Sequence, residues 1–339
     1  MIMMLRLFLF IFIIIGCSEK QYFSPPKESI ISDISIDSKL DSEISQSNRN
    51  GARLSNGSII TKDGIYEINL KENFIFLNTK DNLFLASNYD DNKLYIFNSD
   101  GKELQSFSFS SMPLGATLKD NILAIVLSDN STLLWDIKTN EELFNVKHSN
   151  VYTIDSRVSS PVFTKENVIF PTLDGKLIFV NLKSLKITNN IAIGANNIFN
   201  NIIYLAFEGD NIIAATKNKL VTIIDDKDFN INLNVVDILY AKNKIYVLSL
   251  EGEVIEFNLL LKELNKTKFP FASLSGIIIS DSIYTLESQG YLIKIDPNTF
   301  IDSIYKIDIS KYKNNFYTDD VIYYDNQVIK FPREENASM

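Results

Sequence analysis

The sequence predicts an all-β protein in which one small sheet is repeated around a ring. Two short apolar stretches joined by a tight polar turn recur along the chain from about Asn56. The turns follow one another at a nearly constant interval, and no helical periodicity of similar strength accompanies them. The 45% hydrophobic and 12% aromatic content supplies a large core, while 12 Gly and 8 Pro argue against a collagen-like or low-complexity body. We predict a β-propeller of about seven four-stranded blades, with eight as the alternative.

The first element is an apolar leader that ends at the only cysteine. Arg6 is the only charge before Cys17, and residues 7–15 are an unbroken apolar run. A charged start followed by a short apolar core is the layout of a secretory signal. The run is shorter than the roughly 20 apolar residues of a transmembrane helix.

The end of the leader, Ile14-Ile15-Gly16-Cys17, resembles the lipobox of bacterial lipoproteins. The resemblance implies that residues 1–16 are a signal peptide and that Cys17 carries diacylglycerol and an acylated amino group. Several acyl chains anchor a protein stably, whereas one chain holds it only marginally. Ser18 stands where aspartate would favour the inner membrane, which implies lipid anchoring in the outer membrane, facing the periplasm. The alternative is an ordinary signal peptide or signal anchor with a stray cysteine.

The segment after the cysteine, residues 18–50, is rich in Ser, Asp, Glu and Lys, and most of its apolar residues are isolated isoleucines. Partial alternation within it is compatible with a strand. Its composition nevertheless favours a flexible, solvated tether. We therefore expect the lipidated cysteine and tether to occupy residues 17–50, and the propeller residues 51–339.

The repeat itself is marked by seven turn dipeptides rich in Asp, Asn and Gly, which tolerate the positive φ of two-residue hairpin turns. They are Asp91-Asn92, Asp129-Asn130, Asp174-Gly175, Lys217-Asn218, Glu251-Gly252, Gln289-Gly290 and Asp325-Asn326. Asn92 and Asn326 are 234 residues apart and enclose six intervals, so the mean period is 39 residues. This is close to the roughly 40–45 residues of one four-stranded propeller blade.

The last repeat lacks an outer strand, because only residues 321–324 and 327–331 read as strands before the sequence ends. We expect residues 65–70 to supply the missing strand, so that an N-terminal strand closes the ring and removes an open sheet edge. Residues 58–64 resemble the start of another hairpin, and this keeps eight blades as the alternative.

The repeat resembles bacterial propellers of the PQQ-like and WD-repeat kind. The phrase LLWDIKTNEEL, which starts at Leu133, is similar to the WD pattern, with Trp135-Asp136 ending a strand before a polar turn. PQQ-type repeats carry a tryptophan in each blade, whereas Trp135 is the only one here. This departure argues against PQQ binding, and we predict no cofactor. Tyr and Phe side chains are expected to take over the packing between blades.

Candidate catalytic and metal-ligating residues are few. His148 is the only histidine, which excludes histidine-based zinc, copper or haem sites, and we expect it in a surface loop. The acidic pairs Asp90-Asp91, Asp225-Asp226 and Asp319-Asp320 fall in turns and do not have the spacing of a calcium loop. We predict no catalytic, cofactor or metal site. Two carboxylates from distant blades could still form a glycosidase pair, and that alternative stays open.

Two segments fit the extended acidic sequon of bacteria that perform N-linked glycosylation. They are Glu263-Leu264-Asn265-Lys266-Thr267 and Glu334-Glu335-Asn336-Ala337-Ser338. Asn265 and Asn336 are therefore candidate glycosylation sites.

The functional prediction rests on the anchor, the propeller and the missing catalytic residues. The net charge of −9, from 33 Lys and Arg against 42 Asp and Glu, argues against nucleic-acid binding. We predict a monomeric, non-catalytic platform for protein partners. Leader, anchor and propeller together resemble the BamB-type lipoproteins, and this resemblance implies a role with the machinery that assembles outer-membrane β-barrels. The rival hypothesis is an envelope enzyme, or a binder of a small ligand or glycan, that uses the central channel.

Overall fold

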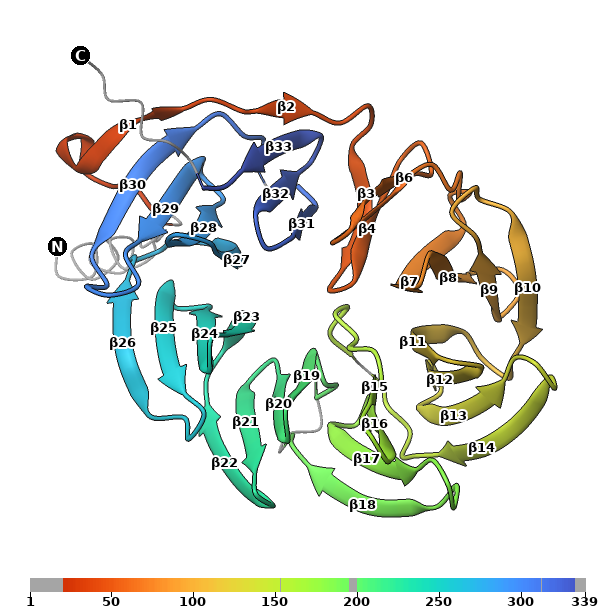
Figure 1. Ribbon diagram of the computed structural model, residues 1–339. Helices are drawn as coiled ribbons and strands as arrows, with labels where there is room; N and C mark the ends of the chain where they lie inside the picture. The colour runs from red at the N-terminus through yellow and green to blue at the C-terminus, as the bar shows by residue number, and fades with distance from the viewer. Residues whose placement is uncertain (1–20, 153, 195–199, 312, 333–339) are drawn as a thin grey trace, which may run out of the picture.

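The computed structural model describes residues 21–152, 154–194, 200–311 and 313–332, which form a β-propeller of eight blades (Figure 1). The predicted fold class is confirmed. The propeller has eight blades, which was the alternative to the expected number of about seven. We number the blades I to VIII in chain order, starting from β3. Within the described residues, no helix has the length and apolar character needed to cross a bilayer.

Blades I to IV take up the first half of the ring. Their strands are β3 (Ile44–Asn48), β4 (Gly51–Leu54), β5 (Ile59–Thr61) and β6 (Gly64–Tyr66) in blade I; β7 (Phe74–Lys80), β8 (Leu83–Asn88), β9 (Lys93–Phe97) and β10 (Glu103–Ser108) in blade II; β11 (Pro113–Lys119), β12 (Ile122–Leu127), β13 (Ser131–Asp136) and β14 (Glu141–Lys147) in blade III; and β15 (Val162–Phe163), β16 (Asn167–Pro171), β17 (Lys176–Asn181) and β18 (Ile187–Ala192) in blade IV.

Blades V to VIII complete it. Their strands are β19 (Tyr204–Glu208), β20 (Asn211–Thr216), β21 (Lys219–Ile224) and β22 (Lys227–Asn232) in blade V; β23 (Val235–Ala241), β24 (Lys244–Ser249), β25 (Glu253–Asn258) and β26 (Glu263–Lys268) in blade VI; β27 (Leu274–Ile279), β28 (Ile283–Glu287), β29 (Tyr291–Ile295) and β30 (Asp302–Ile307) in blade VII; and β31 (Asn315–Tyr317), β32 (Val321–Tyr324) and β33 (Gln327–Lys330) in blade VIII.

All seven predicted turns connect the second and third strands of a blade. Asn92, Asn130 and Asp325 have positive φ there, at 53°, 64° and 57°, as the short polar turn residues allow. The eighth hairpin joins β4 to β5 around Gly57, whose φ is 88°. The third and fourth strands of blade I, β5 and β6, have only three residues each, which is why the repeat is hard to see in this part of the sequence.

The core consists of eight apolar clusters, one at each interface between neighbouring blades. Tyr and Phe side chains contribute to these interfaces as expected: Tyr95 and Phe97 lie between blades I and II, and Tyr284 lies between VII and VIII. Trp135 packs edge-on against Phe109 with their ring centroids 5.5 Å apart. The second and third strands are mostly buried because blades cover both of their faces.

An N-terminal segment closes the ring, but it is not the predicted one. β1 (Ile30–Ile34) pairs in parallel with β30 as a fifth strand of blade VII, and β2 (Ser38–Lys39) pairs antiparallel with β33 as the outer strand of blade VIII. Figure 1 shows both strands running along the outside of these blades. Residues 65–70, which we expected in this place, instead follow the hairpin of blade I, so that prediction is wrong.

The folded domain also begins well before residue 51. Phe23 is buried, and its ring packs edge-on against Phe269 and Tyr291 with centroids 6.0 and 5.6 Å away. A short helix η1 (Lys27–Ser29) follows, and then β1, β2 and β3. The expected flexible tether at residues 18–50 is therefore wrong for the described part of that segment. Isolated isoleucines are sufficient here because an outer strand needs apolar contacts on one side only.

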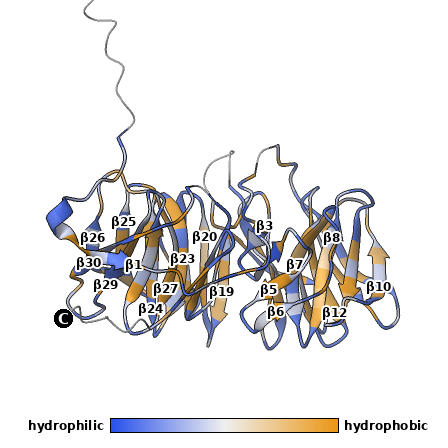
Figure 2. Cartoon of the chain, turned by 90° about the horizontal axis from the view of Figure 1, so that it is seen from above, coloured by the Kyte–Doolittle hydropathy of each residue, from blue (hydrophilic) through white to orange (hydrophobic). Residues whose placement is uncertain are grey.

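Each blade begins with its inner strand, so the inner strands all run in one direction and line the central channel. We call the side on which they begin the upper face, which is uppermost in Figure 2, and the other side the lower face. Turns between second and third strands lie on the upper face, and turns between third and fourth strands lie on the lower face. The described chain begins on the upper face, because Phe23 contacts the loop that follows β26.

Candidate functional site

The central channel is the candidate site, and its wall is a network of side chains bonded to backbone. Asn48 donates to the carbonyl of Phe76 (2.7 Å), Asn78 to that of Ala116 (2.9 Å), and Thr117 to that of Pro161 (2.7 Å). Each bond leads from one blade to the next. The inner edge of a propeller sheet has no further strand to pair with, so these side chains satisfy edge carbonyls and hold blades I to IV together.

The channel is bridged by Arg49, at the tip of the β3–β4 hairpin of blade I. Its guanidinium donates to the Ile238 carbonyl (2.9 Å) and forms an ion pair with Asp237 (2.5 Å) in blade VI. It also lies over the ring of Tyr204 in blade V, 5.0 Å from the ring centroid. Burial within the ring opposes the charge, but Asp237 outweighs it and raises the pKa of Arg49. Arg49 therefore connects opposite sides of the propeller.

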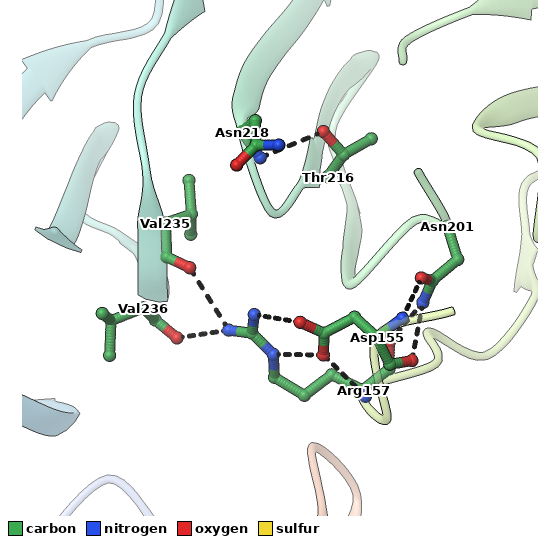
Figure 3. Close-up of polar contacts among 7 residues, drawn as sticks. All are labelled: Asp155, Arg157, Asn201, Thr216, Asn218, Val235 and Val236. Atoms are coloured by element: carbon green, nitrogen blue, oxygen red, sulfur yellow. Dashed lines mark hydrogen bonds and ion pairs between the residues drawn. The ribbon is translucent and has the colours of Figure 1, made fainter. Parts of the chain in front are cut away.

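The loop between β14 and β15 contacts the beginning of β23 through Arg157 (Figure 3). Arg157 donates to the Val236 carbonyl in blade VI (2.6 Å) and pairs with Asp155 (2.7 Å). The fully buried Asn201 accepts from the Asp155 amide and donates to the Arg157 carbonyl, both at 2.7 Å. Burial raises the pKa of Asp155, but hydrogen bonds from Arg157 outweigh it and hold the pKa below its usual range.

A cavity of about 440 Å³ lies beside Arg49 and reaches the lower ends of β7 and β11. Lys80, Lys119 and Arg49 are its charged side chains, and none of its described lining residues is acidic. Lys119 donates to the Thr164 carbonyl (3.2 Å) and lies 5.8 Å from the centroid of the Phe163 ring. Lys80 pairs with the exposed Asp81 (3.3 Å). The cavity therefore suits anionic or hydrogen-bond-accepting groups.

His148 lies directly after the outer strand β14, in the predicted kind of position. Its Nε2 is 2.9 Å from the hydroxyl of Thr132. Burial lowers the pKa of His148, which favours the neutral ring at pH 7. The contacts of this histidine are those of a half-buried structural residue.

The three acidic pairs lie in turns of three different blades, II, V and VIII, and the fold does not bring them together. Asp91 accepts hydrogen bonds from Tyr95 and from the Lys93 amide, and Asp225 and Asp226 adopt positive φ. In the described part of the chain, no three His, Cys, Asp or Glu side chains are grouped as metal ligands.

Of the two asparagines in the glycosylation sequons, Asn265 lies within the described residues and Asn336 lies outside them. Asn265 lies in β26, and its amide donates to Glu256 (3.1 Å), a buried carboxylate that also pairs with Lys244. The nitrogen that makes this bond is the one that would carry a glycan, and glycosylation stays a prediction. Asn336 and the lipidation residue Cys17 lie outside the described residues.

Sequence reasoning missed the two arginines that cross the channel. Arg49 was assigned to the tether, and Arg157 was not singled out. A local signal did exist, because Asn48-Arg49-Asn50-Gly51 has the composition of a tight turn. Their partners could not be inferred, since Ile238 is 189 positions from Arg49 in the sequence.

Fold and channel together define an eight-bladed β-propeller whose blades are linked by contacts across its channel. No family model matches the chain. It is 32% identical over 366 aligned residues to plasminogen-binding protein PgbB of one Helicobacter pylori strain, covering 94% of this chain and 68% of that protein. The protein of the same name from a second strain is 31% identical, and the alignment covers 94% of this chain and 67% of that protein. The chain belongs to the family of these PgbB proteins.

Solved structures confirm the propeller and its resemblance to BamB and WD-repeat proteins at the level of the fold. BamB from Moraxella catarrhalis superposes with a TM-score of 0.67 at 14% identity, covering 87% of this chain and 98% of BamB. The C-terminal WD40 domain of Sif2 superposes with a TM-score of 0.66 at 13% identity, covering 90% of this chain and 100% of that domain.

Proposed function

We propose that this protein is a lipid-anchored, non-catalytic platform that binds a large protein partner, and that plasminogen is that partner. The observation that carries the proposal is the alignment with the plasminogen-binding protein PgbB, which extends over 94% of this chain and therefore over nearly all of the propeller. A relationship of this extent favours a shared binding surface more strongly than a match confined to one segment.

The channel contacts support a rigid platform. Arg49 and Arg157 each tie loops of one blade to inner strand β23 of blade VI. A ring held in this way presents its surface loops in fixed positions, which lowers the entropy cost of binding a partner. Interface energy is concentrated in a few packed anchors, so function should depend on a cluster of loop residues on one face rather than on a single side chain.

Purified mature protein, in detergent and immobilised through a C-terminal tag, tests the proposal by biolayer interferometry with plasminogen. We expect saturable, reversible binding that disappears when the propeller is thermally unfolded. A His148→Ala variant is the matched control and should bind like the wild type. Absence of saturable binding by the folded protein would rule out plasminogen as the partner.

We further propose attachment to the outer membrane through lipid on Cys17. The lipobox-like end of the leader supports this location, and metabolic labelling with an alkyne fatty acid tests it. Wild-type protein should be labelled and the Cys17→Ser variant should not. Equal labelling of the two proteins would contradict lipidation at this residue.

The second candidate function is assistance in assembling outer-membrane β-barrel proteins. The combination of a lipobox-like leader with a propeller that superposes on BamB favours it. Barrel assembly requires the propeller on the periplasm-facing leaflet, whereas binding of plasminogen, an animal plasma protein, requires the outer leaflet. Protease treatment of intact cells distinguishes the two, because only the outward-facing protein is cleaved. Quantitative proteomics of a deletion strain gives a second readout, since barrel assembly predicts a fall in several barrel proteins.

The rival channel function has partial support from the 440 Å³ cavity and its cationic side chains. Glycoside hydrolysis ordinarily uses two carboxylates on either side of the scissile bond. The described lining residues supply no such pair. We therefore place the proposed interaction on the surface loops rather than in the channel.

A further inference from the structure

Three large apolar side chains are exposed on one part of the upper face. Tyr22 keeps 49% of its surface accessible, Leu250 65% and Phe271 61%. We call these three residues the apical patch. Single exposed apolar residues are ordinary, whereas apolar side chains gathered at one place are typical of an interaction surface.

The patch is gathered around Phe269, in the loop between blades VI and VII. The Phe269 amide donates to the Gly252 carbonyl (2.8 Å), which brings this loop against the turn that carries Leu250. Phe271 lies in the same loop, which is closed by the Ala272 amide on the Phe269 carbonyl (3.0 Å). Tyr22 directly precedes Phe23, whose ring packs on Phe269. The backbone therefore fixes the three side chains at the junction of blades VI and VII.

The distance along the chain from the patch to the lipidation residue is short. Phe23 is buried in the cluster between blades VI and VII, so the chain is fixed at that residue. Six peptide steps separate Cys17 from Phe23, and a fully extended chain of that length spans at most about 22 Å. Acyl chains on Cys17 would therefore hold the upper face close to the lipid surface.

We propose that the apical patch docks on the lipid bilayer that holds the acyl chains of Cys17. The inference rests on the proposed lipid anchor and adds an orientation to it. Tyr and Phe suit the boundary between headgroups and acyl chains, where an apolar ring is buried and a polar tip stays hydrated. The upper face is then turned to the membrane. The lower face, with the cavity beside Arg49, is turned away from it and is free for a partner.

The test uses full-length lipidated protein in phosphatidylcholine vesicles with brominated acyl chains, which quench indole fluorescence at short range. A Phe271→Trp variant places an indole in the patch. Its matched control is Leu260→Trp, at a residue that is 54% exposed on the turn between β25 and β26 and thus on the lower face. The native Trp135, packed against Phe109, is the common background in both variants. We expect brominated lipid to reduce the emission of Phe271→Trp and to leave that of Leu260→Trp unchanged.

Flotation of the same vesicles separates the two ways in which the proposal can fail. If both variants float with the vesicles and are quenched equally, or neither is quenched, the docking is wrong and the anchor stands. If the wild type does not float, or a Cys17→Ser variant floats equally well, the lipid anchor is wrong and the docking falls with it.

Discussion

Single residues at the channel wall show how tightly the inner strands fit together. Gly276 in β27 has a φ of +60°, and an added Cβ would lie 1.9 Å from the ring of Tyr317 in the neighbouring blade VIII. The hydroxyl of Tyr317 donates to the Ser275 carbonyl (2.6 Å), so the ring cannot move away without losing that bond. Burial raises the pKa of Tyr317 far above its usual value, which keeps the hydroxyl protonated as a donor.

Gly276→Ala should therefore destabilise the protein by roughly 3 kcal/mol, the sum of backbone strain and overpacking. Gly209→Ala is the control, because Gly209 has nearly the same φ (+61°) but open space around its Cα. It should cost only about 1 kcal/mol. Urea unfolding of both variants measures the difference, and equal losses would show that Tyr317 does not constrain this position.

Arg49→Ala should lower the free energy of unfolding by about 1–2 kcal/mol, because Asp237 would keep its charge inside the ring without its cationic partner. The arginine side chain is 45% exposed to the channel, which limits the effect. Lys80→Ala removes a cation of the same cavity whose ion pair is with the exposed Asp81, and should change stability by less than about 0.5 kcal/mol. Urea unfolding that gives the same midpoint for both variants would contradict a structural role of the Arg49 bridge.

The stability contributed by Asp155 should depend on pH. Its pKa in the folded protein is lower than the usual 3.8, so the contribution is fully present above that value and is lost as the pH falls through the folded pKa. Unfolding free energy measured from pH 6 down to pH 2.5 should fall less steeply for Asp155→Asn than for the wild type. Asp81→Asn, at a 77% exposed side chain, should follow the wild-type curve. Parallel curves for all three proteins would contradict the assignment.

At the scale of elements, the sequence was informative where strands are regular and buried. Seven hairpins could be located from their turn dipeptides, because Asp, Asn or Gly adopts positive φ at six of these turns, all except Lys217-Asn218. Blade I was obscured because β5 and β6 are very short. The closing strands β1 and β2 were mistaken for tether because they lie at sheet edges and bury little. The channel contacts of Arg49 and Arg157 depend on how distant blades are placed, which no local pattern encodes.

The segment that closes the ring gives a prediction for β1. Ile34 packs against the cluster between blades VII and VIII, whereas Ile31 on the same strand is 60% exposed. Ile34→Ser should loosen β1 and make residues 21–39 susceptible to limited proteolysis. The reason is that the apolar contact of Ile34 holds β1 to β30. Ile31→Ser should leave the cleavage pattern unchanged. Equal cleavage of the two variants would indicate that β1 does not depend on this contact.

At the scale of the whole molecule, eight apolar clusters follow one another around the ring, and each is shared by two neighbouring blades. Such an arrangement has no single centre, so it depends on closure, which β1 and β2 provide, and on the bridges through the channel. The result is a rigid disc in which the described part of the chain begins on the upper face. The kinship with PgbB and the proposed anchor support the proposal that this disc is a binding platform at a membrane.

Plasminogen capture by intact cells tests this role most directly. A deletion strain, the strain complemented with wild-type protein, and the strain complemented with Cys17→Ser are compared by flow cytometry with labelled plasminogen. We predict that capture falls on deletion, returns with the wild type and does not return with Cys17→Ser. Undiminished capture by the deletion strain, together with no saturable binding by the purified propeller, would contradict it.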